Sequence, residues 1–217
     1  MFGRLLLMFV FGLLSTSISA QSENFSEVFR ACRLAQSSMS GGEGSQSEIR
    51  EAADMLTATL WNPLILQNVD VRKEESIKNH LVFSPEFLKD VVDDRSVYRR
   101  AKKYAEEQMS EQRGGNVFLC TKCIKGGGQV VYAIRHHGGT FNIAAVAEIN
   151  GLINLSVVVK DARGNESKPY KVSSNEFKGD SYRILNNIPI PKGNSVIYIT
   201  LENKSKKAKS VAIIAEY

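Results

Sequence analysis

Two cysteines and two histidines lie close together in the second half of the chain, where they raise the question of redox or metal chemistry. Cys120-Thr-Lys-Cys123 has the spacing of a redox dithiol. Such a dithiol needs its first cysteine at a helix N-terminus, where the helix dipole stabilises the thiolate, but this motif follows a β-like run and precedes three glycines. His136 and His137 are adjacent, so on a strand they point to opposite faces and cannot readily share one zinc ion. Redox catalysis and zinc binding are therefore both disfavoured.

The cysteine count is odd, because the chain has three cysteines in all. In an oxidising compartment this number leaves one cysteine over. The sequence is compatible with a local disulfide between Cys120 and Cys123, with a disulfide from Cys32 to either of them, or with three reduced thiols.

The acidic residues of the second half offer one candidate cation site and no recognisable catalytic pair. Asp161, Asn165 and Asp180 fall in expected loops, where their oxygens could bind calcium, although the same residue types also form plain turns. No Gly-x-Ser-x-Gly motif is present, and no local signature marks a cysteine–histidine protease. Two carboxylates that meet only in space could still form a hydrolase site. We therefore expect no cofactor other than calcium.

Aromatic side chains are the groups on which sugar rings stack, and few of them stand near expected loops. Tyr170, Phe177 and Tyr182 do, and together they could form a stacking platform for a carbohydrate. The alternative is that they pack into the core or its rim. Trp61 is the only tryptophan, and it is expected to plug the junction between the two halves of the chain.

Charge is distributed unevenly along the chain. Residues 21–116 carry 13 basic and 16 acidic side chains, while residues 117–217 carry 14 and 7. The positive excess of the second half favours an anionic or carbohydrate ligand, with Lys204, Lys206 and Lys207 as candidate contacts. Alternatively, the acidic half docks on the basic half, or these lysines only keep a hairpin soluble. Nucleic acid is not expected, because no aromatic side chains are interleaved with the lysines.

Helices are expected to carry most of the first half. Apolar residues recur at helical spacing over 24–39 and again over 47–61, with a Gly- and Ser-rich linker at 40–46 between them. A further helix is expected to start with Ser84 as its cap and Pro85 at its first position, to break around Asp93 and Asp94, and to resume as far as about Glu111. The segment 64–71 is expected to be extended or to form an edge strand.

From residue 117 onward, apolar and polar residues alternate, which is typical of β-strands. Eight strands are expected at 117–120, 129–137, 141–149, 152–160, 170–173, 181–185, 195–203 and 210–216. Turns rich in Gly, Asn and Pro separate them, and each long strand has one apolar face, as two packed sheets require. The sequence thus predicts an α+β fold, in which a helical N-terminal segment precedes an antiparallel, jelly-roll-like β-sandwich of about eight strands.

Within this pattern, 130–160 is expected to form a three-stranded meander. His-Gly-Gly and Ile-Asn-Gly-Leu separate its apolar runs, and such residues favour hairpin turns. The alternation also assigns the faces of the strands. The face opposite the core is predicted to carry Asn154, Ser156, Lys160, Tyr198 and Thr200.

The first 20 residues have the order of a secretory signal peptide. One positive charge at Arg4 is followed by a short apolar run and then by small residues that end at Ala20. That apolar run is too short to cross a membrane as a helix, and no longer one follows. We therefore expect a signal peptide at 1–20, a mainly helical region at 21–116 and a β-sandwich domain at 117–217. The mature chain, cleaved near Ala20, is expected to be secreted or periplasmic, without a transmembrane span.

Two strand endings in the second half form a further pattern. The strand at 155–160 runs into an Asp-x-x-Gly turn, and the strand at 195–203 ends in Asn before a last strand. In this layout the sandwich resembles the bacterial pre-peptidase C-terminal domain and its secreted relatives. The resemblance implies a non-catalytic accessory or targeting domain, although such domains usually accompany an enzyme, for which residues 21–116 are too few. The whole chain also resembles small exported proteins of gut-type bacteria in which helices precede a sandwich.

Together these features predict a secreted or periplasmic, non-catalytic binding or accessory protein of the bacterial cell envelope. Its basic sandwich would recognise an anionic or carbohydrate ligand, so that a cell-envelope component or a glycan is the expected partner. The alternative is a small secreted hydrolase whose carboxylate or Cys/His site is assembled only in space. A pocket that converges on two titratable groups would favour the enzyme, and a flat or basic face would favour binding.

Overall fold

The computed structural model describes residues 22–38, 45–69, 115–148, 152–172 and 181–217, together with Arg95, Arg99, Lys102 and Lys103. These four single residues are helical, and they are the described part of the helix expected at 84–111. The expected signal peptide at 1–20 and most of the linker at 40–46 lie outside the described residues. In the part of the chain that is described, no helix is long and apolar enough to cross a membrane.

Two helices begin the described chain, close to where the sequence predicts them. α1 spans Glu23–Ser38 and α2 spans Ser45–Ala58. Ser22 caps α1, because its Oγ accepts a hydrogen bond from the Phe25 backbone N–H at 3.2 Å. Trp61 follows α2 and is 7% exposed, and its Nε1 donates to the Leu56 carbonyl at 3.1 Å. Trp61 packs into the core that joins the helices to the sandwich, at the junction expected from its position.

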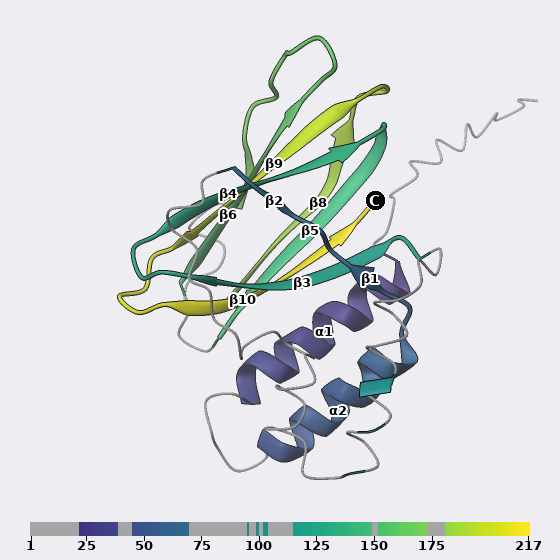
Figure 1. Ribbon diagram of the computed structural model, residues 1–217, viewed down its shortest axis with the longest axis vertical. Helices are drawn as coiled ribbons and strands as arrows, with labels where there is room; N and C mark the ends of the chain where they lie inside the picture. The colour runs from purple at the N-terminus through teal and green to yellow at the C-terminus, as the bar shows by residue number, and fades with distance from the viewer. Residues whose placement is uncertain are drawn as a thin grey trace, which may run out of the picture.

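Within the described residues, ten strands form two five-stranded sheets. Their bounds are β1 Asn62–Pro63, β2 Gln67–Asn68, β3 Val117–Ile124, β4 Gln129–His136, β5 Gly139–Ala147, β6 Ile153–Lys160, β7 Tyr170–Lys171, β8 Tyr182–Ile190, β9 Ser195–Asn203 and β10 Lys209–Glu216. Sheet A has the order β1-β3-β10-β5-β8, and sheet B has the order β2-β4-β9-β6-β7. The predicted α+β sandwich is confirmed; β2 is an edge strand within 64–71, as one expectation for that segment had it, and β1 is a further short strand (Figure 1).

The meander expected at 130–160 is wrong. β4 and β6 belong to sheet B, whereas β5, which lies between them in sequence, belongs to sheet A. Gly138 and Gly139 do form a tight turn, with φ angles of 73° and 101°, but this turn carries the chain across the core to the other sheet. Alternating apolar residues look the same in both arrangements, so the sequence did not distinguish them. Apart from β6 and β7, successive strands from β3 to β10 alternate between the sheets, as in a jelly roll.

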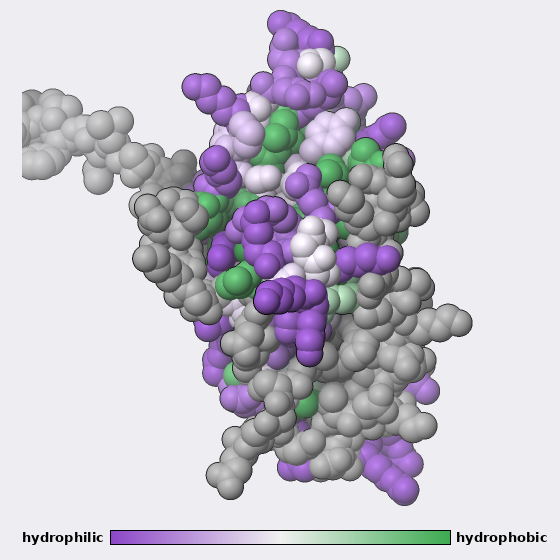
Figure 2. Space-filling model, turned by 90° about the vertical axis from the view of Figure 1, so that its left-hand side faces the viewer, coloured by the Kyte–Doolittle hydropathy of each residue, from purple (hydrophilic) through white to green (hydrophobic). Residues whose placement is uncertain are grey.

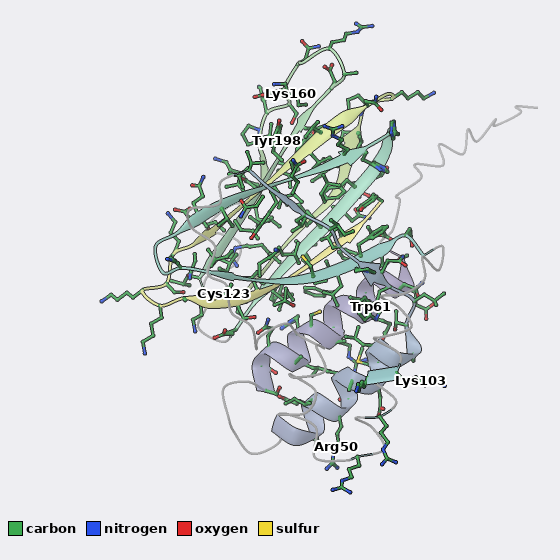
Figure 3. The ribbon with its side chains drawn as sticks, in the orientation of Figure 1. Arg50, Trp61, Lys103, Cys123, Lys160 and Tyr198 are labelled. Carbon is green, nitrogen blue, oxygen red and sulfur yellow. The ribbon has the colours of Figure 1, made fainter. Side chains whose placement is uncertain are left out.

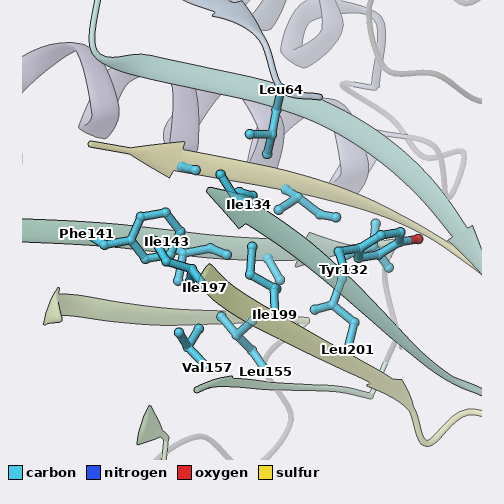
Figure 4. Close-up of a cluster of buried hydrophobic side chains, with 14 of the residues drawn as sticks. Leu64, Tyr132, Ile134, Phe141, Ile143, Leu155, Val157, Ile197, Ile199 and Leu201 are labelled. Carbon is cyan, nitrogen blue, oxygen red and sulfur yellow. The ribbon is translucent and has the colours of Figure 1, made fainter. Parts of the chain in front are cut away.

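The larger core lies between the two sheets. Alternate side chains of the long strands fill it, and Leu155 and Val157 of β6 meet Ile197, Ile199 and Leu201 of β9 there (Figure 4). All five are 3% exposed or less. The face assignment made from the alternation of the sequence is therefore confirmed for these two strands.

α1 packs on the outer face of sheet A, and α2 packs against α1 (Figure 1). A second cluster of buried side chains joins Phe25, Val28 and Cys32 of α1 to Ala144 of β5 and Ala212 of β10. The two alanines are small, which lets the helix approach the sheet closely. Among the described residues, sheet B has no such helix layer on its outer face.

A buried carboxylate connects the start of α1 to sheet A. Glu216 at the end of β10 is 6% exposed and accepts hydrogen bonds from Asn142 Nδ2 at 2.8 Å and from Asn116 Nδ2 at 3.1 Å. The Ser22 backbone N–H also donates to Glu216 Oε1 at 3.3 Å. Because Ser22 lies at the positive end of the α1 dipole, a negative charge is favourable there.

Candidate ligand-binding site

β3 places the two cysteines of the Cys-Thr-Lys-Cys motif on opposite faces. Cys120 packs against the core between the sheets, whereas Cys123 points to the other side of the strand and is buried there. Residues three apart on a strand are separated by about 10 Å, which is more than a disulfide can bridge. The structure has three thiols and no disulfide among Cys32, Cys120 and Cys123. Burial, and to a lesser degree Cys120, raises the pKa of the Cys32 thiol far above its ordinary range, so Cys32 is a neutral packing group.

The adjacent histidines do not come together in one site. His136 packs edge-on against Tyr217, with ring centroids 4.9 Å apart, while His137 is exposed. Partial burial lowers the pKa of His136 below its ordinary value, which favours the neutral imidazole. Within the described residues, no group of three or more His, Cys, Asp or Glu side chains is arranged to hold a metal ion.

The structure brings Asp161 and Asn165 together as partners in a closed turn. Asp161 Oδ1 accepts from the backbone N–H groups of Arg163 and Asn165, both at 2.8 Å, and Oδ2 accepts from Asn165 Nδ2 at 2.9 Å. These hydrogen bonds, first that of the Asn165 side chain, hold the pKa of the Asp161 carboxyl below its ordinary value. Both carboxylate oxygens of Asp161 thus accept hydrogen bonds from within the turn. Asp180 lies outside the described residues, so a calcium site that includes it stays a prediction.

The two described members of the expected aromatic platform lie on different sheets. Tyr170 is on β7 of sheet B and packs against the core between the sheets. Tyr182 begins β8 of sheet A and contacts Phe29 of α1, with ring centroids 5.4 Å apart. The Arg33 guanidinium also lies over the Tyr182 ring, at 4.4 Å from its centroid. Both tyrosines therefore take part in core packing, and Phe177 lies outside the described residues.

The three candidate lysines lie in the connection from β9 to β10. Lys204 pairs with Glu202, with Nζ and Oε1 2.5 Å apart, and Lys206 and Lys207 are exposed. This connection joins sheet B to sheet A, so the hairpin expected here is wrong for the same reason as the meander. The lysines lie at an end of the sandwich, not at a sheet edge.

The open outer face of sheet B contains a polar groove. β4, β9 and β6 are neighbours, and the register places Gln129, Glu202 and Asn154 in one row across this face. Thr200 and Ser156 form the next row, which Lys171 of β7 extends. The groove has a volume of about 560 Å³ and is lined by Gln129, Asn154, Leu155, Ser156, Lys171, Val172, Arg183, Thr200 and Glu202. Sites for small ligands commonly have volumes of roughly 300–1,000 Å³.

The groove combines neutral hydrogen-bonding groups with two cations, Lys171 and Arg183, and Glu202 is the one carboxylate among its described lining residues. Asn154 Nδ2 donates to Glu202 Oε2 at 3.2 Å. The hydrogen bonds from Lys204 and then Asn154 lower the pKa of the Glu202 carboxyl. An ionised carboxylate accepts hydrogen bonds but does not deliver a proton at neutral pH. These lining residues therefore do not supply the carboxylate pair that glycoside hydrolysis requires.

Tyr198 stands beside the groove on the central strand β9. In the register it pairs with Ala133 of β4 and Val158 of β6, so both of its neighbours in the row have smaller side chains than Tyr198. Thr200 of the groove is the next outward residue along β9, about 6.6 Å away. On the other side, Lys160 belongs to the following row, and Figure 3 shows Tyr198 and Lys160 close together on the upper part of the sandwich.

The described surface in Figure 2 shows hydrophobic residues as small separate patches among hydrophilic ones. Scattered apolar residues of this kind are normal on a surface that meets water. A polar ligand is therefore a better match to the described part of this face than a broad apolar one.

The sequence predicts the orientation of some groove residues but not that the groove forms. Alternation placed Asn154, Ser156 and Thr200 opposite the core, where the structure has them. Gln129 and Glu202 carried no local signal, because they become neighbours only when β4 and β6 pair with β9. That pairing joins residues far apart in the chain.

The chain matches no family model and no curated protein. Among solved structures, it is similar to the Yersinia pseudotuberculosis-derived mitogen at 18% identity and a TM-score of 0.32, over 47% of this chain and 86% of that one. PliG of Salmonella Typhimurium, a periplasmic inhibitor of g-type lysozyme, has 17% identity and a TM-score of 0.31, over 49% and 91%. A family 16 carbohydrate binding module has 12% identity and a TM-score of 0.26, over 49% and 86%. At these identities and TM-scores the similarities say nothing about what this chain binds.

Proposed function

We propose that the protein is a non-catalytic carbohydrate-binding protein of the bacterial cell envelope, secreted or periplasmic, and that it holds a glycan in the polar groove of sheet B. The observation that carries this proposal is the groove, with its neutral hydrogen-bonding groups, beside the aromatic ring of Tyr198. Sugars present hydroxyl groups at their edges and apolar C–H groups on their faces. The groove and Tyr198 match these two kinds of surface.

The spacing of the outward residues suits a chain of sugar rings. A ring stacked on Tyr198 would leave the next ring over Thr200 and Ser156, because outward residues two apart on a strand are separated by about 6.6 Å. Asn154 and Gln129 then offer amide donors and acceptors in the following row. The glycan would thus run along β9 toward Glu202.

Two further features support binding without catalysis. Glu202 is paired with Lys204 and is the one carboxylate of the described lining, which disfavours the alternative of a small hydrolase in this groove. The resemblance to pre-peptidase C-terminal domains implies the same accessory role, and the expected signal peptide supports export.

The proposal is tested with a glycan array, followed by titration calorimetry with an oligosaccharide that the array selects. Tyr198→Ala should weaken binding by at least about fivefold, because it removes the stacking surface. Asn154→Ala should also weaken binding severalfold, by removing hydrogen bonds to the ligand. Lys192→Ala, an exposed truncation in the connection from β8 to β9, should leave the affinity unchanged.

A blank array would contradict the proposal, all the more if the purified protein hydrolysed a generic ester, peptide or glycoside. Equal loss of affinity in the Lys192 and Tyr198 variants would also contradict it. Circular dichroism of each variant shows that the fold is retained.

A further inference from the structure

Two loops at one end of the sandwich are held together as one surface. The connections from β3 to β4 and from β9 to β10 lie side by side at that end (Figure 1). Asn203 is fully buried between them, and its Nδ2 donates to the carbonyls of Ile124 and Lys207, both at 2.9 Å. The Gly127 backbone N–H donates to the Ser205 carbonyl at 3.0 Å. Each loop therefore positions the other.

Gly126 shows how closely the two backbones approach. A Cβ atom at this position would lie 2.2 Å from the Lys206 carbonyl oxygen, so no larger residue fits without moving a loop. The lysines of the second loop are thus held against the first loop. They are not carried on a separate flexible hairpin.

The surface formed by the two loops is basic. Lys125, Lys204, Lys206 and Lys207 are all exposed there, and together with Leu152 we call them the basic tip. Lys204 pairs with Glu202, but Lys206 and Lys207 form no ion pair with any carboxylate in the described part of the chain. The tip therefore presents uncompensated positive charge to any partner.

Leu152 is an exposed apolar residue within this cluster of lysines. Its side chain is at the same end because its N–H donates to Ser205 Oγ at 3.0 Å and its carbonyl accepts from the Lys204 N–H at 2.7 Å. Leu152 is 47% exposed, one of few large apolar side chains so exposed among the described residues. Lysines that only kept the loop soluble would not need a leucine among them.

We propose that the basic tip docks on an anionic lipid surface, with Lys206 and Lys207 at the headgroups and Leu152 inserted at the interface. Basic residues are attracted to anionic lipid headgroups, and an adjacent apolar side chain adds burial that a soluble polyanion does not provide. This docking is independent of glycan binding. The groove begins at Gln129 and Glu202, next to the tip, so a docked protein holds its groove beside the membrane.

The test is sedimentation of the purified protein with phosphatidylcholine vesicles that contain or lack phosphatidylglycerol, at an ionic strength of about 0.15 M. The protein should bind only the anionic vesicles. Lys206→Glu combined with Lys207→Glu should weaken partitioning by at least roughly thirtyfold, because each lost lysine removes about a fivefold factor and each new glutamate is repelled by the anionic headgroups. The matched control combines Lys168→Glu with Lys192→Glu, which changes the net charge equally at exposed positions in other loops and should have little effect.

Leu152→Ser separates a lipid surface from a soluble polyanion. It should weaken vesicle binding by about fivefold but leave binding to heparin unchanged, since only the membrane buries the side chain. Leu60→Ser is the matched control, because Leu60 is 45% exposed and lies outside the tip.

Three outcomes would overturn the proposal: no binding to anionic vesicles, equal loss in the two lysine double variants, or full vesicle binding by Leu152→Ser. The last outcome, with retained lysine dependence, would mean that the tip recognises anionic partners by charge alone, without insertion of Leu152. Tyr198→Ala should still bind vesicles, so failure of the tip proposal and failure of the glycan proposal are distinguishable.

Discussion

The outer faces of the two sheets differ in what covers them and in which residues they carry. On sheet A, β5 and β10 are buried on both sides, because one side meets the core between the sheets and the other meets α1. On sheet B, β6 and β9 alternate between buried and more exposed residues, and no described helix covers them. The apolar residues on both faces of β5 and β10 thus reflect the helix layer, and the alternation of β6 and β9 reflects the open face of sheet B.

The strongest test of this difference between buried and open faces compares two adjacent valines on β6. Val157 is fully buried in the core between the sheets, while Val158 points to the open face of sheet B. Val157→Asp should lower the free energy of unfolding by at least about 4 kcal/mol, because it buries an unpaired charge, and should leave the protein largely unfolded. Val158→Asp should retain a cooperative urea transition. A cooperative transition in the Val157 variant would disprove the register of β6.

A second pair compares alanines on the two outer faces. Ala144 of β5 is fully buried beneath the helices, whereas Ala133 of β4 lies on the open face beside Tyr198. Ala144→Glu should cost about 2–4 kcal/mol in urea unfolding, because the added side chain and its charge do not fit under α1. Ala133→Glu should cost less than about 1 kcal/mol. Similar costs for the two variants would mean that α1 does not pack on sheet A as described.

A third comparison, with a smaller expected change in the free energy of unfolding, uses one carboxylate from each sheet. Glu216 accepts three hydrogen bonds at the start of α1, and Glu216→Gln should cost about 1–3 kcal/mol, because one carboxylate oxygen becomes an NH2 group that faces the donating amide of either Asn116 or Asn142. Glu202→Gln on the open face should cost much less in the same urea titration. Equal costs would remove the assigned role of Glu216 as the anchor of α1.

The pH dependence of the Glu202 contribution follows from its hydrogen bonds. Lys204 and Asn154 lower the pKa of the folded-state carboxyl below its ordinary value of 4.5. The contribution is therefore complete above about pH 4.5 and is lost as the pH falls through the lowered pKa. Between pH 6 and pH 3, roughly, wild type should lose slightly more stability than Glu202→Gln.

The candidate site could be predicted only in part, for reasons visible in particular residues. Asn154, Ser156 and Tyr198 were placed on the solvent side by period-two alternation, which is a local property. The platform of Tyr170, Phe177 and Tyr182 is predicted because all three stand near expected loops, and the crossing from sheet B to sheet A puts Tyr170 and Tyr182 on different sheets. Cys120 and Cys123 share a short motif, yet the pleat of β3 turns them to opposite sides.

Local residue order suffices to identify the two described helices, the eight strands of the sandwich and the inward face of β6 and β9, since periodicity and turn residues act over a few positions. It cannot specify which strands become neighbours. β10 lies between β3 and β5, and β9 lies between β4 and β6, because strands pair by closing long loops around a shared core. Only that closure brings Gln129, Asn154 and Glu202 into one row and Lys206 next to Gly126, so the groove and the basic tip are products of the tertiary structure.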